Sequence, residues 1–181
     1  MILLARHGQT EWNVSHRRQG RLDSPLTAQG IEHAHEVARA AAAYPVDAIA
    51  SSPLGRARRT AEIVSQALGL GVVVIDDLAE IDHGSFTTLT TEEIDRLHPG
   101  WSVEREADLY HWRFPGGESY EDARERAERV LAHPVVTEHS CPLLVGHQMI
   151  GRMFMAILER LTPDEALARN LPHGTVVAFP D

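Results

Sequence analysis

Five side chains that could carry out one reaction follow short apolar segments of the sequence. They are Arg6 and His7 after residues 2–5, Arg56 after residues 46–51, Glu80 after residues 72–75 and His147 after residues 143–146. Phosphoryl transfer through a histidine needs a nucleophilic ring nitrogen, cationic donors for the phosphate oxygens and an acid for the leaving oxygen. The five residues supply this set, but they do not by themselves decide which histidine is the nucleophile.

Three further residues are candidates for lining an anion site beside the arginines. Gly8 and Gly20 would let the backbone approach an anion closely, because glycine has no β-carbon. Asn13 could supply a neutral amide donor. Arginine suits such a site because its planar guanidinium binds two oxygens at once and stays charged. The set predicts a pocket for one small anion.

The segments between these residues predict how they are brought together. Strands are expected at residues 2–5, 46–51, 72–75, 143–146 and 175–179, and helices at residues 27–44, 52–68, 118–131 and 149–161, with Thr27 as an N-cap and Gly69 as a helix end. This alternation predicts an α/β fold: a single three-layer domain with a mostly parallel central sheet and helices on both faces. Ligands of such sheets bind outside the carboxyl ends of the strands, where the five residues would meet.

Length, charge and composition limit the other classes of function. The 181 residues suit one domain, 1–181, in which residues 83–117 are either a loop or an excursion over the sheet edge that could form a lid. A net charge of −9 argues against nucleic acid or a membrane surface as partner. The single cysteine, Cys141, favours a reducing compartment, and no run of about 18 apolar residues occurs, so we expect a cytoplasmic protein.

Six segments form an ordered set along the chain: RHGQTEWN, QGRLDSPLTAQG, SSPLGRARRTA, LAEIDHG, PGGESYED and LLVGH. Together they extend from residue 6 to residue 147 and resemble the histidine phosphatase superfamily of phosphoglycerate mutase-like proteins, in particular its phosphatase branch. The resemblance implies the phosphoglycerate mutase-like fold. A tripeptide such as RHG arises by chance, whereas the ordered set is specific.

The resemblance also implies roles that the residues alone leave open. His7 takes the phosphoryl group, Glu80 donates the proton, and Arg6, Arg56 and His147 surround the phosphoryl group. The substrate-binding residues are expected to be Gly8, Asn13, Gln19, Gly20 and Gln148. No cofactor and no metal are expected, because the arginines and His147 would neutralise the charge that a metal otherwise neutralises.

Two positions depart from the family pattern. Many relatives have Trp-Glu-Gly after the glycine of LAEIDHG, the acid segment, which contains Glu80. This chain has Ser85-Phe86-Thr87-Thr88 after Gly84. The residue after His147 is often glycine but is Gln148 here. The first departure concerns the substrate-side wall of the site, and the second would narrow the pocket.

Several assignments stay open at this level. The carboxylate could be one of the neighbours of Glu80, which are Asp76, Asp77 and Asp82. The arginines at positions 17, 18 and 21 are either a rim that attracts a polyanionic substrate or a charged loop. The aromatic residues at positions 101, 110 and 112 are either a lid over the site or core.

The sequence favours a metal-independent phosphomonoesterase, of the histidine acid phosphatase type, acting on a small soluble phosphate ester. One alternative is a phosphoglycerate mutase-type phosphoryl transfer. Another is a phospho-ligand-binding module without catalysis, although a binder would need the arginines and not Glu80. The sequence does not indicate the substrate or the oligomeric state.

Overall fold

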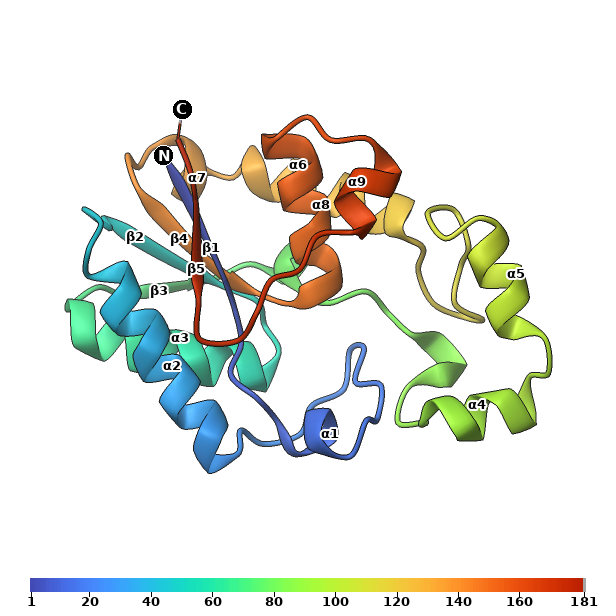
Figure 1. Cartoon of the computed structure of the whole chain (residues 1–181). Coiled ribbons are helices and arrows are strands. Elements are labelled where there is room, and N and C mark those ends of the chain that lie inside the picture. Colours follow the sequence, from blue (N-terminus) through green and yellow to red (C-terminus); the bar gives the residue numbers. More distant parts are fainter. Residues whose placement is uncertain (181) are drawn as a thin grey trace.

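The computed structural model describes residues 1–180, which are built around a five-stranded sheet (Figure 1). The strands are β1 (Ile2–Arg6), β2 (Ala48–Ser51), β3 (Val72–Val74), β4 (Pro142–Gly146) and β5 (Val176–Phe179). Their order in the sheet is β3-β2-β4-β1-β5; the first four strands run parallel, and β5 pairs antiparallel with β1. The expected α/β fold with a mostly parallel sheet is confirmed.

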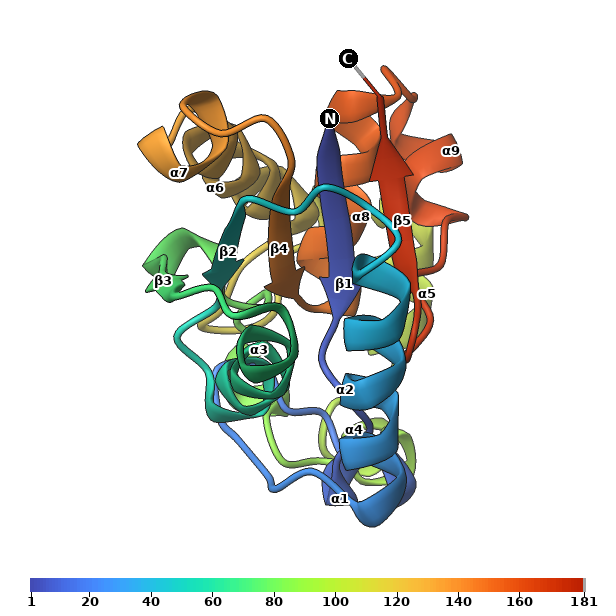
Figure 2. The ribbon, with the colours of Figure 1, turned by 90° about the vertical axis from the view of Figure 1, so that its left-hand side faces the viewer.

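Helices cover both faces of this sheet (Figure 2). They are α2 (Ala28–Ala41) and α3 (Gly55–Leu68) on one face, and α6 (Tyr120–Leu131) and α8 (Gln148–Leu158) on the other. Successive side chains of a strand point to opposite faces. Accordingly, Leu3 and Ala5 belong to the core under α2 and α3, whereas Leu4 belongs to the core under α6 and α8. The three-layer arrangement is confirmed.

Local signals define the ends of two helices. Thr27 Oγ1 accepts the N–H of Gly30 at 3.0 Å, so the predicted N-cap of α2 is confirmed. Gly69 ends α3 in the left-handed conformation, with a φ of 69°, which glycine adopts at no steric cost. The predicted ends at residues 44 and 161 are wrong, because α2 ends at Ala41 and α8 ends at Leu158.

Four shorter elements connect the main ones: α1 (Glu11–Val14), the 3₁₀ helix η1 (Asp76–Leu78), α7 (Pro134–Thr137) and α9 (Pro163–Leu167). Each is a single turn or little more, too short to give a helical period in the sequence. Over the described chain, residues 1–180, none of the helices combines the length and the apolar character needed to cross a membrane.

Residues 83–117 extend beside the sheet as a lobe that contains helices, at the right of Figure 1. The lobe holds the 3₁₀ helix η2 (Gly84–Phe86), α4 (Thr91–Leu97) and α5 (Trp101–Ala107). An excursion was one of the two alternatives for this segment, but its helices were not expected. The sequence signal for α4 is its capping box, in which Thr90 and Glu93 bind each other's backbone N–H.

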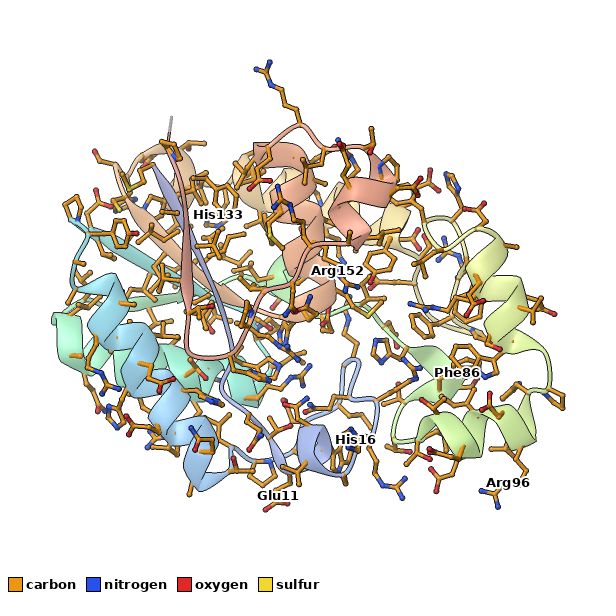
Figure 3. The ribbon with its side chains drawn as sticks, viewed as in Figure 1. Glu11, His16, Phe86, Arg96, His133 and Arg152 are labelled. Carbon is orange, nitrogen blue, oxygen red and sulfur yellow. The ribbon has the colours of Figure 1, made fainter. Side chains whose placement is uncertain are left out.

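Aromatic side chains form the core of the lobe. The ring of Phe86, labelled in Figure 3, lies with its centroid 5.4 Å from that of Trp101 and 5.9 Å from those of Trp112 and Phe114. Phe86 is fully buried and Trp101 is buried. Trp101 and Trp112 therefore stabilise the lobe from within, as the core-packing alternative predicts.

The backbone that follows β1 packs directly on the start of α2. A β-carbon on Gly8 would lie 2.0 Å from the carbonyl oxygen of Gly30. One on Gly30 would lie 1.9 Å from the carbonyl oxygen of Gln9. Both distances are far inside van der Waals contact, so two glycines are needed for β1 to lead into this loop.

Replacing Gly8 with alanine should therefore destabilise the protein. Forcing extra atoms into a packed interior costs about 1–3 kcal/mol, and a clash with backbone should reach the upper end. Urea denaturation measures the loss. The matched control is Gly71→Ala, where a β-carbon meets nothing within 4 Å. Equal stability of the two variants would contradict the close packing.

Candidate active site

The carboxyl ends of β1, β2 and β4 meet at one edge of the sheet, where a polar cavity opens. Arg6 pairs with Gly146, and Ser51 pairs with Val145, so the strands end at the same level. The cavity has a volume of ≈ 180 Å³ and is lined by Arg6, His7, Asn13, Arg17, Arg18, Gln19, Gly20, Arg56, Glu80, His83, Gln148 and Met149. All the predicted site residues except Gly8 and His147 are in this lining.

His7 is held with one defined ring nitrogen protonated. The ring is buried, and its Nδ1 lies 2.7 Å from the carbonyl oxygen of Gly8. A carbonyl only accepts, so Nδ1 donates the hydrogen bond and Nε2 of the neutral ring carries a lone pair. Burial and the nearby charges of Arg56 and Arg6 lower the pKa of His7 well below its ordinary value. His7 is therefore a neutral base or nucleophile at pH 7.

His147 lies beside His7, with the two ring centroids 5.1 Å apart. Its ring is fully buried, and its Nε2 is 2.8 Å from Ser52 Oγ, while its Nδ1 has no hydrogen-bond partner. Burial and the charge of Arg56 lower the pKa of His147 well below its ordinary value. Burial, together with the charge of the same arginine, thus favours the neutral form of both imidazoles.

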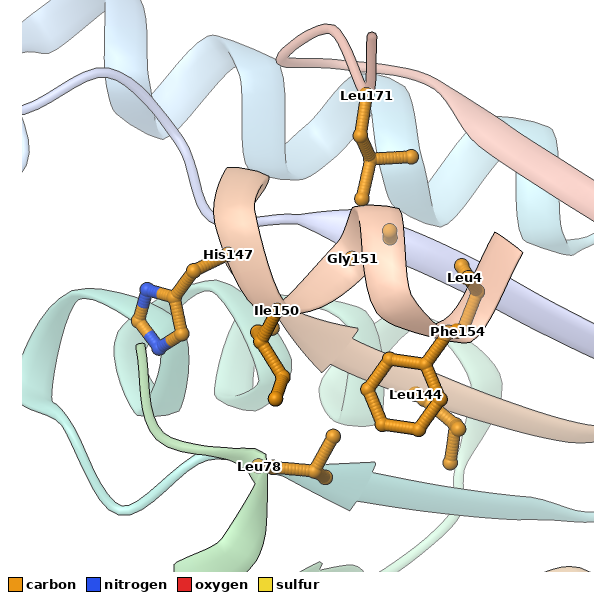
Figure 4. Close-up of a pocket in the computed structure, with 10 residues that line it drawn as sticks. Leu4, Leu78, Leu144, His147, Ile150, Gly151, Phe154 and Leu171 are labelled. Atoms are coloured by element: carbon orange, nitrogen blue, oxygen red, sulfur yellow. The ribbon is translucent and has the colours of Figure 1, made fainter. Parts of the chain in front are cut away.

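His147 also lines a small apolar pocket (Figure 4). The pocket there is lined by Leu4, Ala5, Leu78, Leu144, Gly146, His147, Ile150, Gly151, Phe154 and Leu171. Its volume of ≈ 10 Å³ is about that of one water probe. It therefore packs the histidine and does not hold a ligand.

Arg56 is anchored from α3 by its own charge partners. One guanidinium nitrogen donates to Leu22 O at 2.6 Å and to Asp23 Oδ1 at 2.8 Å, and the other donates to Gly20 O at 2.9 Å. The side chain is almost fully buried. Burial lowers the pKa of Arg56, and Asp23 acts in the opposite direction, so the charge is retained on a fixed group.

Glu80 is held at the N-terminus of α8. Its Oε1 accepts the N–H groups of Ile81 at 2.9 Å and Ile150 at 3.0 Å, and its Oε2 accepts the N–H of Met149 at 3.1 Å. A carboxyl group offers about four acceptor positions, so one position on Oε2 stays open. Of the neighbouring carboxylates left open above, Asp77 pairs with Arg129, and none lines the cavity.

Arg126 of α6 fixes the segment that carries Glu80. Its guanidinium donates to the carbonyl oxygens of Asp77 and Ala79, each at 2.7 Å, and pairs with Glu118 at 2.9 Å. Glu118 in turn accepts the N–H of Asp82 at 2.9 Å. The two buried or half-buried charges thus hold both sides of the acid segment, although neither touches the cavity.

The two predicted glycines have different roles. Gly20 lines the cavity with a φ of 50°, and a β-carbon there would lie 2.9 Å from the backbone nitrogen of His83. Gly8 contacts Gly30 instead and lies outside the lining, so the predicted approach of its backbone to an anion is replaced by an approach to α2. Its carbonyl oxygen nevertheless orients His7.

The two predicted amides, Asn13 and Gln19, lie in the loop after β1. Asn13 Oδ1 accepts the N–H of Thr10 at 3.0 Å, which leaves its amide N–H groups for the cavity. Gln19 Nε2 donates a hydrogen bond to Thr10 Oγ1 at 2.8 Å, and Gln19 Oε1 accepts one from Ser24 Oγ at 3.4 Å. Gln19 thus supports the loop as well as lining the cavity.

Gln148 ties the site to the segment that precedes β5. Its Oε1 accepts the N–H of Leu171 at 3.0 Å and lies 3.4 Å from a guanidinium nitrogen of Arg6. The side chain, and not only the backbone, therefore contributes to the cavity wall. From the same segment, His173 Nδ1 donates to the carbonyl oxygen of His7 at 2.5 Å.

Sequence reasoning did not assign His83 and Met149 to the cavity, and it left Arg17 and Arg18 undecided. The ring of His83 is buried, and its Nε2 lies 3.2 Å from Met149 Sδ. Its position three residues after Glu80, in LAEIDHG, was the available signal. In residues 1–180, no group of three or more His, Cys, Asp or Glu side chains could hold a metal ion.

Acid should destabilise the protein because its buried histidines bind protons less readily when folded. Burial lowers the pKa of His83 to about 3 and that of His173 to about 4, and the pKa values of His7 and His147 also fall. Between these values and the ordinary pKa of about 6.5, only the unfolded chain takes up the protons. The free energy of unfolding should therefore decrease as the pH falls below about 6.5.

Urea denaturation between about pH 7.5 and pH 5 measures this slope. His83→Gln should make the decrease shallower, because it removes one such group. His35→Gln is the control, since His35 is exposed on α2. A slope that both variants change equally would count against the buried rings as its origin.

Comparisons with known proteins agree on the family and on the fold of this chain. The family model of the histidine phosphatase superfamily (branch 1) matches residues 2–179. The probable phosphoglycerate mutase GpmB of Salmonella choleraesuis (strain SC-B67) is 37% identical over 159 residues, which cover 87% of this chain and 74% of that protein.

Solved structures extend the similarity to the fold. A putative alpha-ribazole-5'-P phosphatase from Escherichia coli K-12 superposes with a TM-score of 0.88 at 25% identity, over 97% of this chain and 87% of that chain. The mycobacterial glucosyl-3-phosphoglycerate phosphatase in complex with VO3 superposes with a TM-score of 0.87 at 29% identity, over 97% and 88%. With the family match spanning nearly all of its residues, the chain belongs to the histidine phosphatase superfamily.

Proposed function

We propose that this protein is a metal-independent phosphomonoester hydrolase that acts on a small phosphate ester through a phosphohistidine formed on His7. The observation that carries the proposal is the hydrogen bond from His7 Nδ1 to the carbonyl oxygen of Gly8. It leaves Nε2 of a neutral ring as the nucleophile beside Arg6 and Arg56. The superfamily and the named phosphatases among the solved structures support the same class of reaction.

In the first half-reaction, the lone pair of His7 Nε2 attacks phosphorus in line with the ester oxygen. The N–P bond forms, the P–O bond breaks, and the bonding electrons pass to the leaving oxygen. Glu80 supplies the proton that this oxygen needs, from the open position on its Oε2. The product alcohol then leaves.

In the second half-reaction, water attacks the phosphorus of the phosphohistidine. Glu80 takes a proton from the water as the O–P bond forms, and the N–P bond breaks with its electrons returning to His7 Nε2. Inorganic phosphate leaves, and Glu80 is again protonated. One carboxyl group therefore serves both steps.

Unpartnered buried donors support the placement of the phosphoryl group. Within residues 1–180, the buried side-chain nitrogens without a hydrogen-bond partner belong to Arg6, Arg18, Arg21, Arg56, His83 and His147. Buried polar groups are nearly always paired, and Arg6, Arg18, Arg56 and His83 line the cavity, which supports the binding of an anion there. Phosphate oxygens would accept hydrogen bonds from Arg6 Nε, Arg56 Nε and a protonated His147 Nδ1, and these donors would take the role that a metal has in other phosphatases.

The substrate is proposed to be small. The cavity of ≈ 180 Å³ is below the range of about 300–1,000 Å³ that is usual for drug-sized ligands. The solved relatives are named for alpha-ribazole-5'-P and glucosyl-3-phosphoglycerate, which are both phosphate esters.

Phosphoglycerate mutase activity is the second candidate, because the curated relative carries the name probable phosphoglycerate mutase. A mutase uses the same nucleophile but returns the phosphoryl group to a hydroxyl of the substrate. Released phosphate, measured against isomerised phosphoglycerate, separates the two. A binding module without catalysis has less support, because it would not need Glu80 in the lining.

His7→Ala should abolish turnover of phosphate esters, because the covalent route is lost with the nucleophile. The wild-type protein, quenched during turnover of a ³²P-labelled ester, should carry acid-labile, base-stable phosphate on His7. His35→Ala is the control, since it removes an exposed histidine. A His7→Ala protein with near wild-type rates would refute the assignment, and substrate binding without phosphoryl-enzyme or product would favour the binding module.

Glu80→Gln should slow the reaction without preventing it. General acid catalysis contributes about 10² to 10⁴-fold, and glutamine keeps the size of the side chain but cannot exchange the proton. The loss should be smallest for p-nitrophenyl phosphate, whose leaving group needs little protonation. Comparing kcat for this ester and for an alkyl phosphate measures the difference, and equal losses for both esters would argue against an acid role.

A further inference from the structure

The peptide group between His7 and Gly8 lies where the chain leaves the sheet, and side chains bind both of its ends. The N–H of His7 still donates to the carbonyl oxygen of Gly146 in β4, at 3.0 Å. At the next peptide group, the carbonyl oxygen of His7 and the N–H of Gly8 are bound by the side chains of two residues that are distant in the sequence. These residues are His173 and Thr60.

Thr60 holds the N–H end of this peptide group from α3. The N–H of Gly8 donates to Thr60 Oγ1 at 3.0 Å, and Thr60 Oγ1 donates to the carbonyl oxygen of Arg56, one helical turn earlier, at 2.9 Å. Thr60 is fully buried. Its hydroxyl group has one proton, which goes to Arg56, so a lone pair faces Gly8. The loop after β1 is therefore connected to the helix that carries Arg56.

His173 holds the carbonyl end from the segment that precedes β5. Its Nδ1 donates to the carbonyl oxygen of His7 at 2.5 Å. Its ring stacks on the ring of His33 in α2, with the centroids 5.4 Å apart and the planes 5° from parallel. The next residue, Gly174, has a φ of 74°, and a β-carbon there would lie 2.1 Å from Glu36 Oε2 of the same helix. Packing against α2 therefore fixes the ring that binds His7.

The hydrogen bond that selects the tautomer of His7 depends on this peptide group. His7 Nδ1 donates to the carbonyl oxygen of Gly8 at 2.7 Å. The position of that oxygen relative to the ring changes with the torsions on either side of the peptide group, which are ψ of His7 and φ of Gly8. Glycine restricts φ less than any other residue. Holding both ends of the peptide group therefore compensates for the freedom of Gly8.

We propose that Thr60 and His173 are positioning residues, which hold the peptide group between His7 and Gly8 from its two ends and so keep His7 in the tautomer and direction needed for attack on phosphorus. The inference rests on the proposed function, in which His7 Nε2 is the nucleophile. Thr60 and His173 lie outside the cavity lining, so each acts through the backbone. Misalignment of the reacting atoms should therefore lower kcat more than it changes KM.

Two pairs of variants separate hydrogen bonding from packing. Thr60→Val keeps the size of the side chain and loses the hydroxyl group, whereas Thr60→Ser keeps the hydroxyl group. His173→Leu loses the donor, whereas His173→Asn keeps one, because the amide nitrogen of asparagine is as many bonds from the backbone as Nδ1 of histidine.

Thr60→Val and His173→Leu should lower kcat for p-nitrophenyl phosphate by about tenfold or more and change KM by less than about threefold, because the nucleophile is misaligned while the phosphate site remains. Thr60→Ser and His173→Asn should keep kcat near the wild-type value. The matched control for the loss of an imidazole is His35→Leu, which removes an exposed ring of α2 and should leave kcat unchanged.

The ¹⁵N NMR signals of the His7 ring give a readout that is independent of turnover. In wild-type protein labelled with ¹⁵N-histidine, one ring nitrogen of His7 should be protonated and the other not at about pH 7. Comparison with the His7→Ala spectrum assigns the two signals. In Thr60→Val and His173→Leu the two chemical shifts should move toward each other, because both tautomers become populated. A role in stability alone would leave these shifts unchanged.

The proposal is overturned if Thr60→Val and His173→Leu keep wild-type kcat and a single tautomer of His7. It is also overturned if Thr60→Ser is as slow as Thr60→Val, since packing would then be the cause. Equal losses in His173→Asn and His173→Leu would likewise overturn it, because an ionisable ring and not a donor would then be required. Circular dichroism checks that each variant is folded, and the His173 pair decides if Thr60→Val is not, because His173 is only half-buried.

Failure of the proposed function has a different outcome. A wild-type protein that forms neither phosphate nor phosphohistidine contradicts the hydrolase, and mixed tautomers in Thr60→Val and His173→Leu would still support the positioning role. Hydrolysis through His7 with the same kcat and the same single tautomer in all four variants contradicts the positioning role and leaves the hydrolase intact.

Discussion

The burial of neutral imidazoles among guanidinium groups is the constraint on which the rest of this structure depends. Burial disfavours a proton on His7 and His147, and the charges of Arg56 and Arg6 act in the same direction. Positive charge is thus collected at one edge of the sheet in a chain with a net charge of −9. Such a site is costly without a ligand, because buried donors are left unpaired. It is suited to an anion that enters and leaves.

Keeping this arrangement rigid requires contacts far from the cavity. Gly8 and Gly30 allow the loop after β1 to lie on α2, and that loop supplies the carbonyl oxygen that orients His7. Arg126 and Glu118 hold the acid segment from α6. Glu118 also pairs with Arg21, which belongs to the loop after β1. That loop and the segment that carries Glu80 are therefore held by one ionic network.

The sequence predicted those parts of the fold that local patterns specify. The carboxyl ends of the strands, which lie within one residue of the predicted positions, the cap at Thr27 and the stop at Gly69 each depend on residues within one turn or one strand. Helix ends were less accurate, since α2 ends at Ala41 within a run of alanines that carries no stop signal. The lobe was the weakest part, because its helices are short and its core is formed by aromatic residues separated by irregular backbone.

The sequence by itself determined the chemistry available to this protein, namely the arginines, histidines and carboxylate at the ends of strands and their order in a family pattern that spans the chain. Only the tertiary structure decided which of these groups are free to act. It showed that Arg17 and Arg21 are neutralised by Glu93 and Glu118, while Arg18 is not. It also moved Gly8 from the predicted ligand contact to a packing contact. The reason is physical: the pairing of charges and the approach of backbones depend on which distant segments meet, and a local pattern does not contain that information.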